Sequence, residues 1–466
     1  MFKDLGLLHA RERTKGAFDD LRDHFKVTPD KHLSLHNVDL FELSRSEDTP
    51  LFVFDEDCLV KNLATIFDAF KSHYPNIIVS YSIKTNDNLA ICKVMKDNNA
   101  YAEVASELDL YVAEKLDIPG ERIIFDGGFK PDKVIRKALE RRILIINAES
   151  FTELERIDKI ANEMEIIQSV GLRISSWKPK IFLKNLRLSN INDTVNCNSS
   201  SRFGFSVKDA KLVFQRHANY KNLRIEGLMV HPYHSAIETF ASMIKDARSL
   251  GIELKYLNIG GSFDPGFLQY VNYMDIILDL IRQRFGFGSK IDERKSKSPD
   301  IRISAKHIAN KVKELGLNPM PTIISEPGAF IVRPAGLLLV KVDHVKISGG
   351  YKWVIVDGGK NIVPATTVFA RQDVVVANKM DQKSLEVVNI VGPNIFIDDI
   401  LALNKPLPLI EEGDVLAIFD CGAYSLTDST QFLYPRPGAV MINSKSEVRK
   451  IRDRETCDNV IYKDMM

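Results

Sequence analysis

The chain has 466 residues, of which 45% are hydrophobic and 27% charged, and its formal net charge is +1. This balance is typical of a globular protein and excludes a disordered or strongly basic chain, so we expect no nucleic-acid partner. No apolar run reaches the roughly 18 to 20 residues of a membrane span, and the five cysteines form no CxxC pair and no Cys/His metal spacing. We therefore expect a cytoplasmic protein with no membrane partner, no disulfide framework and no metal site.

The chain begins with an N-terminal extension, residues 1–47, in which residues 11–25 have helical character. The apolar segment TPLFVFD, residues 49–55, predicts a strand. Residues 56–74 repeat apolar side chains at a spacing of about 3.6, which predicts an amphipathic helix. We place the first domain at 48–335 and leave open whether the strand at 49–55 joins the second domain.

Eight short apolar segments follow, and most are separated from the next by an amphipathic helical pattern. They predict strands at 77–84, 100–106, 122–127, 143–148, 167–175, 224–232, 254–260 and 322–328. Near-continuous apolar strands that alternate with helices indicate a parallel sheet covered on both faces. Eight such units close a (β/α)8 barrel, which we favour over an open doubly wound sheet.

Two regions interrupt this rhythm. The charged stretch at 285–303 predicts an insertion between the seventh and eighth strands. From residue 336 to 466 the apolar segments follow one another without long helices, which predicts a mostly β domain. Its predicted strands are at 336–347, 351–359, 373–379, 384–393, 414–424 and 439–444. The predicted fold class is therefore α/β, a TIM-type barrel with a mostly β C-terminal domain.

The active site of such a barrel lies where the strands end, at the C-terminal face. The first strand ends in Lys84, the sixth in His231 and the eighth in Glu326. The other strand ends that carry polar or glycine residues provide Glu103 and Ser106 (second), Arg173 (fifth), and Gly260, Gly261 and Ser262 (seventh). One amine, one imidazole, carboxylates and a glycine-rich turn would thus meet at one mouth.

This combination suggests pyridoxal phosphate (PLP) as the cofactor. Lys84 alone is weak evidence, because most lysines lie at the surface. A glycine-rich turn after the seventh strand can bind a phosphate through backbone N–H groups. A lysine that faces a phosphate site can form a Schiff base with PLP. An acid such as Glu326 would keep the pyridine nitrogen protonated, and His231 could lie against the ring.

The residues that carry this chemistry lie in motifs that resemble those of a known family. YSIKTN, EVASELDL, IINAESFTELERI, NIGGSF, SEPGAFIV and DCGAYSLTDSTQFLYPRP occur in this order. The chain resembles the fold-type III PLP-dependent decarboxylases, which include the diaminopimelate, ornithine and arginine decarboxylases and have an alanine-racemase-like barrel. The resemblance implies catalytic Lys84, His231 and Glu326. It also implies a cofactor site of Lys84, His231, Gly260, Gly261, Ser262, Glu326 and Tyr424, and a homodimer with shared active sites.

Several positions depart from the family pattern. The arginine that usually follows EPG is Ala329, and the histidine segment reads HPYHS, with Tyr233 and His234 in place of small residues. The third glycine of the phosphate turn is Ser262. In VGPNIFIDDIL, where the family has a cysteine followed by an acid that reaches the partner subunit's site, this chain has Ile395 and Phe396. Asp399 matches a later aspartate.

The altered loop bears on the substrate. A carboxylate favours a distal cation through a charge-assisted hydrogen bond, and an Ile-Phe-Ile segment offers none. We therefore expect an amino acid or conjugate with an atypical distal group, such as a siderophore precursor or a carrier-protein-tethered amino acid, rather than lysine, ornithine or diaminopimelate. Three alternatives stay open: a diaminopimelate-type decarboxylase with a diverged pocket, an amino-acid racemase, and a catalytically silent relative. Glu326 argues against the racemase, which usually has an arginine at the pyridine nitrogen.

Overall fold

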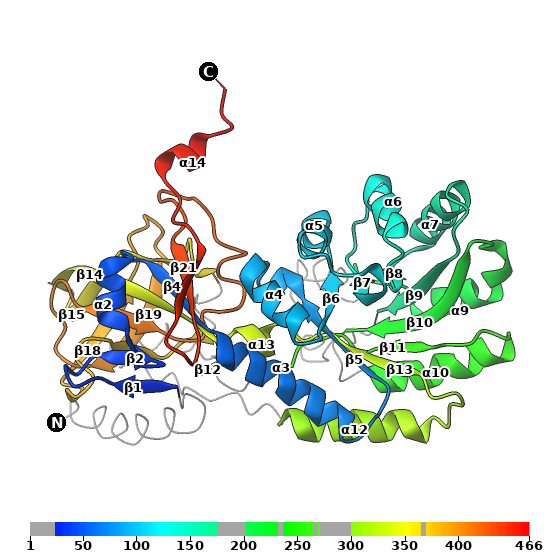
Figure 1. The fold of residues 1–466 in the computed structure, drawn as a ribbon, viewed down its shortest axis with the longest axis horizontal. Coiled ribbons are helices and arrows are strands. Elements are labelled where there is room, and N and C mark those ends of the chain that lie inside the picture. Colours follow the sequence, from blue (N-terminus) through cyan, green and yellow to red (C-terminus); the bar gives the residue numbers. More distant parts are fainter. Residues whose placement is uncertain are drawn as a thin grey trace, which may run out of the picture. The chain divides into compact units, whose positions relative to one another are not determined.

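The computed structural model describes residues 24–175, 202–231, 236–263, 269–270, 300–364 and 370–465. The predicted helix at 11–25 and the predicted insertion at 285–303 lie almost entirely outside them. The chain divides into two compact units, each described here by itself. The barrel unit comprises the described residues of 63–263 and 299–328. The β unit comprises those of 1–62, 264–298 and 329–466 (Figure 1).

Eight parallel strands close the barrel, with each strand beside the next in chain order and the last beside the first. They are β5 (Ile77–Ser82), β6 (Tyr101–Val104), β7 (Ile123–Phe125), β8 (Ile145–Ala148), β9 (Gln168–Ile174), β10 (Leu223–Val230), β11 (Tyr256–Asn258) and β13 (Thr322–Ser325). Each predicted strand overlaps one of these, so the predicted fold is confirmed. Ile124, Ile145 and Ile324, from three different strands, pack together in a core cluster of the barrel.

Helices and short turns connect the strands of the barrel (Figure 1). They are η1 (Ile83–Thr85), α4 (Leu89–Asp97), α5 (Glu107–Lys115), η2 (Gly120–Arg122), α6 (Asp132–Glu140), α7 (Phe151–Glu163), α9 (Val207–Gln215), η4 (His217–Asn219), α10 (Ala236–Ser249) and α12 (Ile301–Glu314). Several begin at a side-chain cap: Ser106 accepts a hydrogen bond from the backbone of Asp109, and Ser150 from that of Glu153. Such caps satisfy backbone N–H groups at a helix start and fix where each helix leaves its strand.

The β unit is built on a nine-stranded sheet. Its strands are β4 (Leu51–Asp55), β14 (Gly336–Ser348), β15 (Tyr351–Val356), β17 (Val374–Val376), β18 (Glu386–Val391), β19 (Ile400–Leu407), β20 (Val415–Ile418), β21 (Gly438–Ile442) and β22 (Val448–Arg452). β14 pairs with β4 and β20 through its first residues and with β15 through its last. Two strands of this sheet were not predicted. β19 contains Pro406 and a left-handed Asn404, and β22 is largely exposed and charged.

β4 lies between β14 and β21, and all five of its residues are buried. A three-stranded sheet, β1 (Phe25–Val27), β2 (Leu33–Leu35) and β3 (Val38–Asp39), precedes it together with α2 (Leu40–Ser46). Residues of β2, α2, β4, β14, β20 and β21 share one apolar core. The remaining elements are α3 (Glu56–Lys71), β12 (Gln269–Tyr270), α13 (Ala329–Val332), β16 (Ala370–Arg371) and α14 (Cys457–Ile461). Within the described parts of the chain, no helix has the length and apolar character needed to cross a membrane.

Candidate active site

Lys84 lies in η1, two residues after the last residue of β5. Its Nζ donates to Ser82 Oγ at 2.7 Å and to Glu103 Oε2. Ser82 Oγ in turn donates to Glu103 Oε2 at 2.5 Å. The Lys84 side chain is 46% exposed, whereas that of Glu103 is fully buried. The strand therefore presents an accessible amine that is held in place by a buried acid.

Three buried carboxylates meet beside this amine. Glu103 is in β6, Asp126 follows β7 and Glu326 follows β13, and their carboxylate oxygens all lie within 4.8 Å of one another. Glu103 Oε1 is buried and receives no hydrogen bond from the described residues. One ammonium group thus faces three acids, and such crowding favours protonation of an acid.

The proton is best placed on Glu326. Its pKa is raised well above the ordinary 4.5, first by burial and then by the like charges of Asp126 and Glu103. Lys84 and a hydrogen bond from Asn258 oppose this only in part. Burial also acts to lower the pKa of Lys84, but the neighbouring carboxylates, Glu103 first, outweigh it, and the net shift is upward. The site therefore favours the charged form of the amine and the neutral form of the buried Glu326.

Asn258, the last residue of β11, connects Glu326 to the glycine-rich turn. Its Nδ2 donates to Glu326 Oε1 at 2.5 Å, and its Oδ1 accepts from the backbone N–H of Gly260 at 2.8 Å. A Cβ on Gly261 would lie 2.2 Å from the carbonyl oxygen of Glu326, so only glycine fits between these two strand ends. Gly260 and Ser262 have left-handed backbones, with φ of 65° and 67°. The contact of Gly261 with the Glu326 backbone and the left-handed conformations of Gly260 and Ser262 curve the turn, so that its backbone can surround an anion.

His231 follows β10 and lies against the same turn. Ser262 Oγ is 3.0 Å from its Nε2, and a Cβ on Gly260 would lie 2.6 Å from its Nδ1. The structure thus brings the predicted residues of the barrel unit to one mouth. Tyr233, His234 and Ser235 lie outside the described residues.

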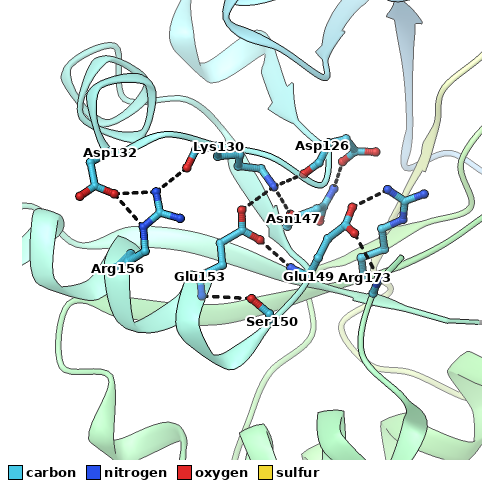
Figure 2. Close-up of polar contacts among 11 residues, drawn as sticks. Asp126, Lys130, Asp132, Asn147, Glu149, Ser150, Glu153, Arg156 and Arg173 are labelled. Carbon is cyan, nitrogen blue, oxygen red and sulfur yellow. Dashed lines mark hydrogen bonds and ion pairs between the residues drawn. The ribbon is translucent and has the colours of Figure 1, made fainter. Parts of the chain in front are cut away.

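Neighbouring strand ends hold the acidic side of the mouth (Figure 2). Asn147 Nδ2 donates to Asp126 Oδ1 at 2.5 Å. Lys130, a fully buried side chain, donates to the carbonyl oxygens of Gly127 at 2.5 Å and Asn147 at 3.0 Å, and to Glu153 Oε1 at 3.0 Å. These bonds join the loops after β7 and β8, so the backbone beside Asp126 is fixed.

The predicted residue Arg173, at the end of β9, pairs with Glu149. Its guanidinium donates to Glu149 Oε1 at 2.6 Å and lies 4.6 Å from the centre of the Phe203 ring. The other oxygen of Glu149 accepts from the backbone of Gly204 at 3.1 Å. Arg173 therefore ties β8 to the segment that follows β9 (Figure 2).

The chemistry of these donors fits PLP. An accessible lysine amine can bond the cofactor's aldehyde carbon, and a neutral acid can share its proton with the pyridine nitrogen. The turn from Gly260 to Ser262 offers a backbone cradle for the phosphate. Residues 60–333 match the family model described as pyridoxal-dependent decarboxylase, pyridoxal binding domain. The chain belongs to this family.

Individual members agree with the assignment. A diaminopimelate decarboxylase from Aquifex aeolicus is 27% identical over 442 residues, which cover 93% of this chain and 95% of the relative. The crystal structure of diaminopimelate decarboxylase from Methanocaldococcus jannaschii has a TM-score of 0.79 at 26% identity, and the match covers 96% of this chain and 98% of that one. The same enzyme in complex with L-lysine gives 0.78. The fold, the PLP cofactor and the carboxy-lyase class predicted from the sequence are confirmed.

The other predicted site residues of the decarboxylase belong to the β unit. Tyr424 is half-buried and has a left-handed backbone, with φ of 54°. The segment 394–399, here called the apolar loop, exposes Ile395 (79%) and Ile397 (99%), and its Phe396 ring stacks on that of Phe432 at 4.4 Å. Asp399 is buried. Their roles in the site stay predictions.

Two polar residues of the mouth were missing from the predicted site. Asp126 directly follows the third barrel strand, a position at which barrels carry functional side chains, so its place in the sequence is the signal that points to it. Asn258 stands two residues before Gly260 in NIGGSF. Its amide bonds both the glycine turn and Glu326, a role that its position two residues before a glycine does not reveal.

Proposed function

We propose that this decarboxylase acts on an amino acid, or an amino-acid conjugate, whose distal end is neutral or bulky rather than a free ammonium group. The observation that supports the proposal most is the orientation of the side chains in the apolar loop. Its buried acid, Asp399, faces the loop's own backbone, and its most exposed side chains are Ile395 and Ile397.

The carboxylate of Asp399 is fully engaged within the β unit. It accepts from the backbone of Lys360 at 2.6 Å, and from the backbone and side chain of Asn394 at 2.7 and 2.8 Å. Asp398, the other acid of the loop, pairs with the ammonium group of Lys360. Neither acid is left to bind a substrate's cation, and apolar side chains give a charged distal group no compensating bond.

In the barrel unit we assign roles to the residues of the mouth. Lys84 would hold the cofactor through its amine, and its Nζ is the group that would return a proton to the substrate's α-carbon. Glu326 would hold a proton at the pyridine nitrogen, and His231 would contact the ring. The turn of Gly260, Gly261 and Ser262 would bind the phosphate, and Tyr424 of the β unit is proposed for the same role. The bound PLP supplies an electron sink for the pair of electrons left when CO2 departs.

The apolar loop also supports a homodimer with shared active sites. Ile395, Ile397, Phe396 and Phe432 form an exposed apolar group, and exposed apolar patches mark protein interfaces. We expect a second copy of the chain to cover it and to receive the loop at its own site. Sedimentation analysis of the native chain and of Ile397→Asp tests this, because the variant should shift the chain towards monomer.

A second candidate is a diaminopimelate decarboxylase with a diverged pocket. The identity of 27% over nearly the whole Aquifex aeolicus enzyme favours it. In this case the distal ammonium and carboxylate would be bound by residues other than the acids of the apolar loop. The two candidates differ in what they require at the distal end.

The test is CO2 release from matched substrate pairs by the PLP-loaded, full-length chain. L-lysine ends in an ammonium group and its Nε-acetyl derivative in a neutral, bulkier amide, and ornithine and its Nδ-acetyl derivative form a second pair. We expect the acylated member to have the higher kcat/KM in each pair. Turnover of meso-diaminopimelate, lysine or ornithine at rates typical of enzymes overturns the proposal, and turnover of meso-diaminopimelate supports the second candidate.

A variant sharpens the same test. Phe396→Asp places an acid where the family has one, and it should improve kcat/KM for lysine relative to Nε-acetyl-lysine. Racemisation without CO2 release would assign a racemase. Absence of a PLP absorption band after incubation with the cofactor would assign a silent relative.

A further inference from the structure

The β unit contains a second group of metal-ligand side chains, separate in sequence from the barrel mouth. It consists of His24, His36 and Asp55, each of which offers one ligand atom within 4.8 Å of the others. His24 Nδ1 lies 2.7 Å from Asp55 Oδ2, and His36 Nε2 lies 3.0 Å from Asp55 Oδ1. Asp57 lies beside this group but outside the 4.8 Å set, with its Oδ2 3.6 Å from His36 Nε2.

The backbone places the two imidazoles side by side. β1 and β2 are antiparallel, with Phe25 opposite Leu35, and the next backbone bond runs from His36 N–H to the His24 carbonyl oxygen at 3.1 Å. His36 and Asn37 both have positive φ, 48° and 65°, as a tight turn between β2 and β3 requires. The two rings are consequently 4.5 Å apart.

The acids come from the next strand and helix. Asp55 is the last residue of β4, and its side chain also accepts from the backbone of Cys58 at 3.0 Å, which caps the start of α3. Asp57 is fixed by the backbone N–H of Ser444, which donates to its Oδ2 at 2.7 Å. A cavity of about 440 Å³, lined by His24 and Asp57 among others, gives ions access to the group.

We propose that His24, His36, Asp55 and Asp57 bind one divalent transition-metal ion, of the chemical class of Zn²⁺. Tetrahedral Zn²⁺ holds N and O ligands at about 2.0–2.2 Å, so ligand atoms are about 3.3 Å apart. The distances from His24 and His36 to Asp55, 2.7 and 3.0 Å, and from His36 to Asp57, 3.6 Å, bracket this value. Each imidazole would bind the ion as a neutral ligand through the nitrogen that now faces Asp55, and its one N–H proton would then sit on the other ring nitrogen.

The ligand set also decides which ion binds. Imidazole nitrogens favour Zn²⁺ and related transition metals, whereas Mg²⁺ and Ca²⁺ require oxygen ligands. Two carboxylates balance the ion's double charge. The bound ion would link the β2–β3 turn to the end of β4. The proposal is independent of the proposed substrate and of the cofactor.

The experiment uses the full-length, PLP-loaded chain after removal of metals with a chelator. Zn²⁺ is titrated in competition with a chromophoric chelator, and Co²⁺ is titrated while its visible d–d absorption is recorded. We expect one equivalent per chain, with d–d bands of tetrahedral intensity. Mg²⁺ at millimolar concentration should not compete. His24→Gln and His36→Gln should each weaken Zn²⁺ binding at least tenfold.

His32→Gln is the matched control. His32 Nδ1 bonds Asp39 Oδ2 at 2.8 Å in the same small sheet, but among the described residues this pair has no second histidine. The His32→Gln variant should bind Zn²⁺ with the native affinity. Glu326→Gln, which alters the acids of the barrel mouth, should also leave it unchanged. An equal loss in either variant, or no saturable binding in the native chain, overturns the proposal.

The histidine variants are compared with the native chain by thermal unfolding without metal. If either fails to fold, Asp57→Asn replaces it, because the Asp57 side chain is 39% exposed and the change leaves Asp55 intact. This variant should weaken Zn²⁺ binding and abolish the tetrahedral Co²⁺ bands. Retained bands would overturn the four-ligand site.

Discussion

Two lysines of the barrel unit, Lys84 just after β5 and Lys130 in the loop after β7, both pair with glutamates, yet their surroundings differ. Lys130 is fully buried and donates to three acceptors, Gly127 O, Asn147 O and Glu153 Oε1. Lys84 is 46% exposed, and its partner Glu103 keeps one buried oxygen without a hydrogen bond from the described residues.

The contrast shows that burial of a lysine does not by itself mark a reactive amine. The ammonium of Lys130 has all three of its donors used, so it holds two loops together. Lys84 faces three carboxylates with one charge, and nearly half of its side chain is exposed. Lys84 is thus distinguished as the catalytic candidate by the exposure of its side chain and by the excess of negative charge around it, and not by burial.

The largest expected effect is loss of activity in Lys84→Arg. Arginine keeps the positive charge beside Glu103, but it cannot form the covalent link to PLP. We expect CO2 release to fall about 10,000-fold or more, as for removal of a nucleophile in other enzymes. The urea midpoint should stay close to that of the native chain. A residual rate within tenfold of native would show that Lys84 does not carry the cofactor.

Lys130→Met should instead reduce stability. It leaves Glu153 as a buried acid without its cation, and loss of one member of a buried pair costs about 3–5 kcal/mol. Urea unfolding of the barrel unit measures the change. The matched control is Lys133→Met on the same segment, because the Lys133–Glu107 pair is exposed and worth at most about 1 kcal/mol. If Lys130→Met and Lys133→Met lowered the free energy of unfolding equally, Lys130 would not have the structural role assigned to it.

Most of the barrel could be predicted because its strands are near-continuous apolar segments, and because most of the segments between them repeat apolar residues at the spacing of a helix. β19 and β22 could not, because β19 contains a proline and a left-handed asparagine, and β22 is charged and largely exposed. Lys84, His231 and Glu326 follow β5, β10 and β13, as their positions at predicted strand ends require, and their roles stay predictions. The domain boundaries predicted at 48 and 336 stay predictions.

What the sequence does not contain is the contact of side chains across strands. The 4.8 Å grouping of Glu103, Asp126 and Glu326 depends on the register of three strands that are far apart in the chain. Asp399 illustrates the same limit, since an aspartate in NIFIDD gives no sign that backbone donors occupy its carboxylate. His24 and His36 meet only because a tight turn sets β2 against β3 and β1 pairs with β2.

A smaller effect is expected for Glu326→Gln. Glutamine keeps an oxygen that can accept from Asn258, but it cannot share a proton with the pyridine nitrogen. Removal of an acid–base group costs about 100-fold or more in kcat. The pH dependence of the cofactor's absorption should change as well. Glu107→Gln, an exposed acid beside β6, is the control. An unchanged kcat would remove Glu326 from the mechanism.

The smallest effect concerns Asp126→Asn and pH. Because the pKa of Glu326 is raised above 4.5, the folded chain retains a proton that the unfolded chain releases. Stability is therefore greatest below this value and falls as pH rises towards the raised pKa. Asp126→Asn removes one like charge and keeps an acceptor for Asn147. The cofactor-free variant should lose less free energy of unfolding between pH 5 and pH 8 than the native chain. Asp132→Asn changes an exposed acid on the same segment and should lose as much free energy of unfolding over this pH range as the native chain. An equal loss in the two variants would show that the charge of Asp126 does not act on Glu326.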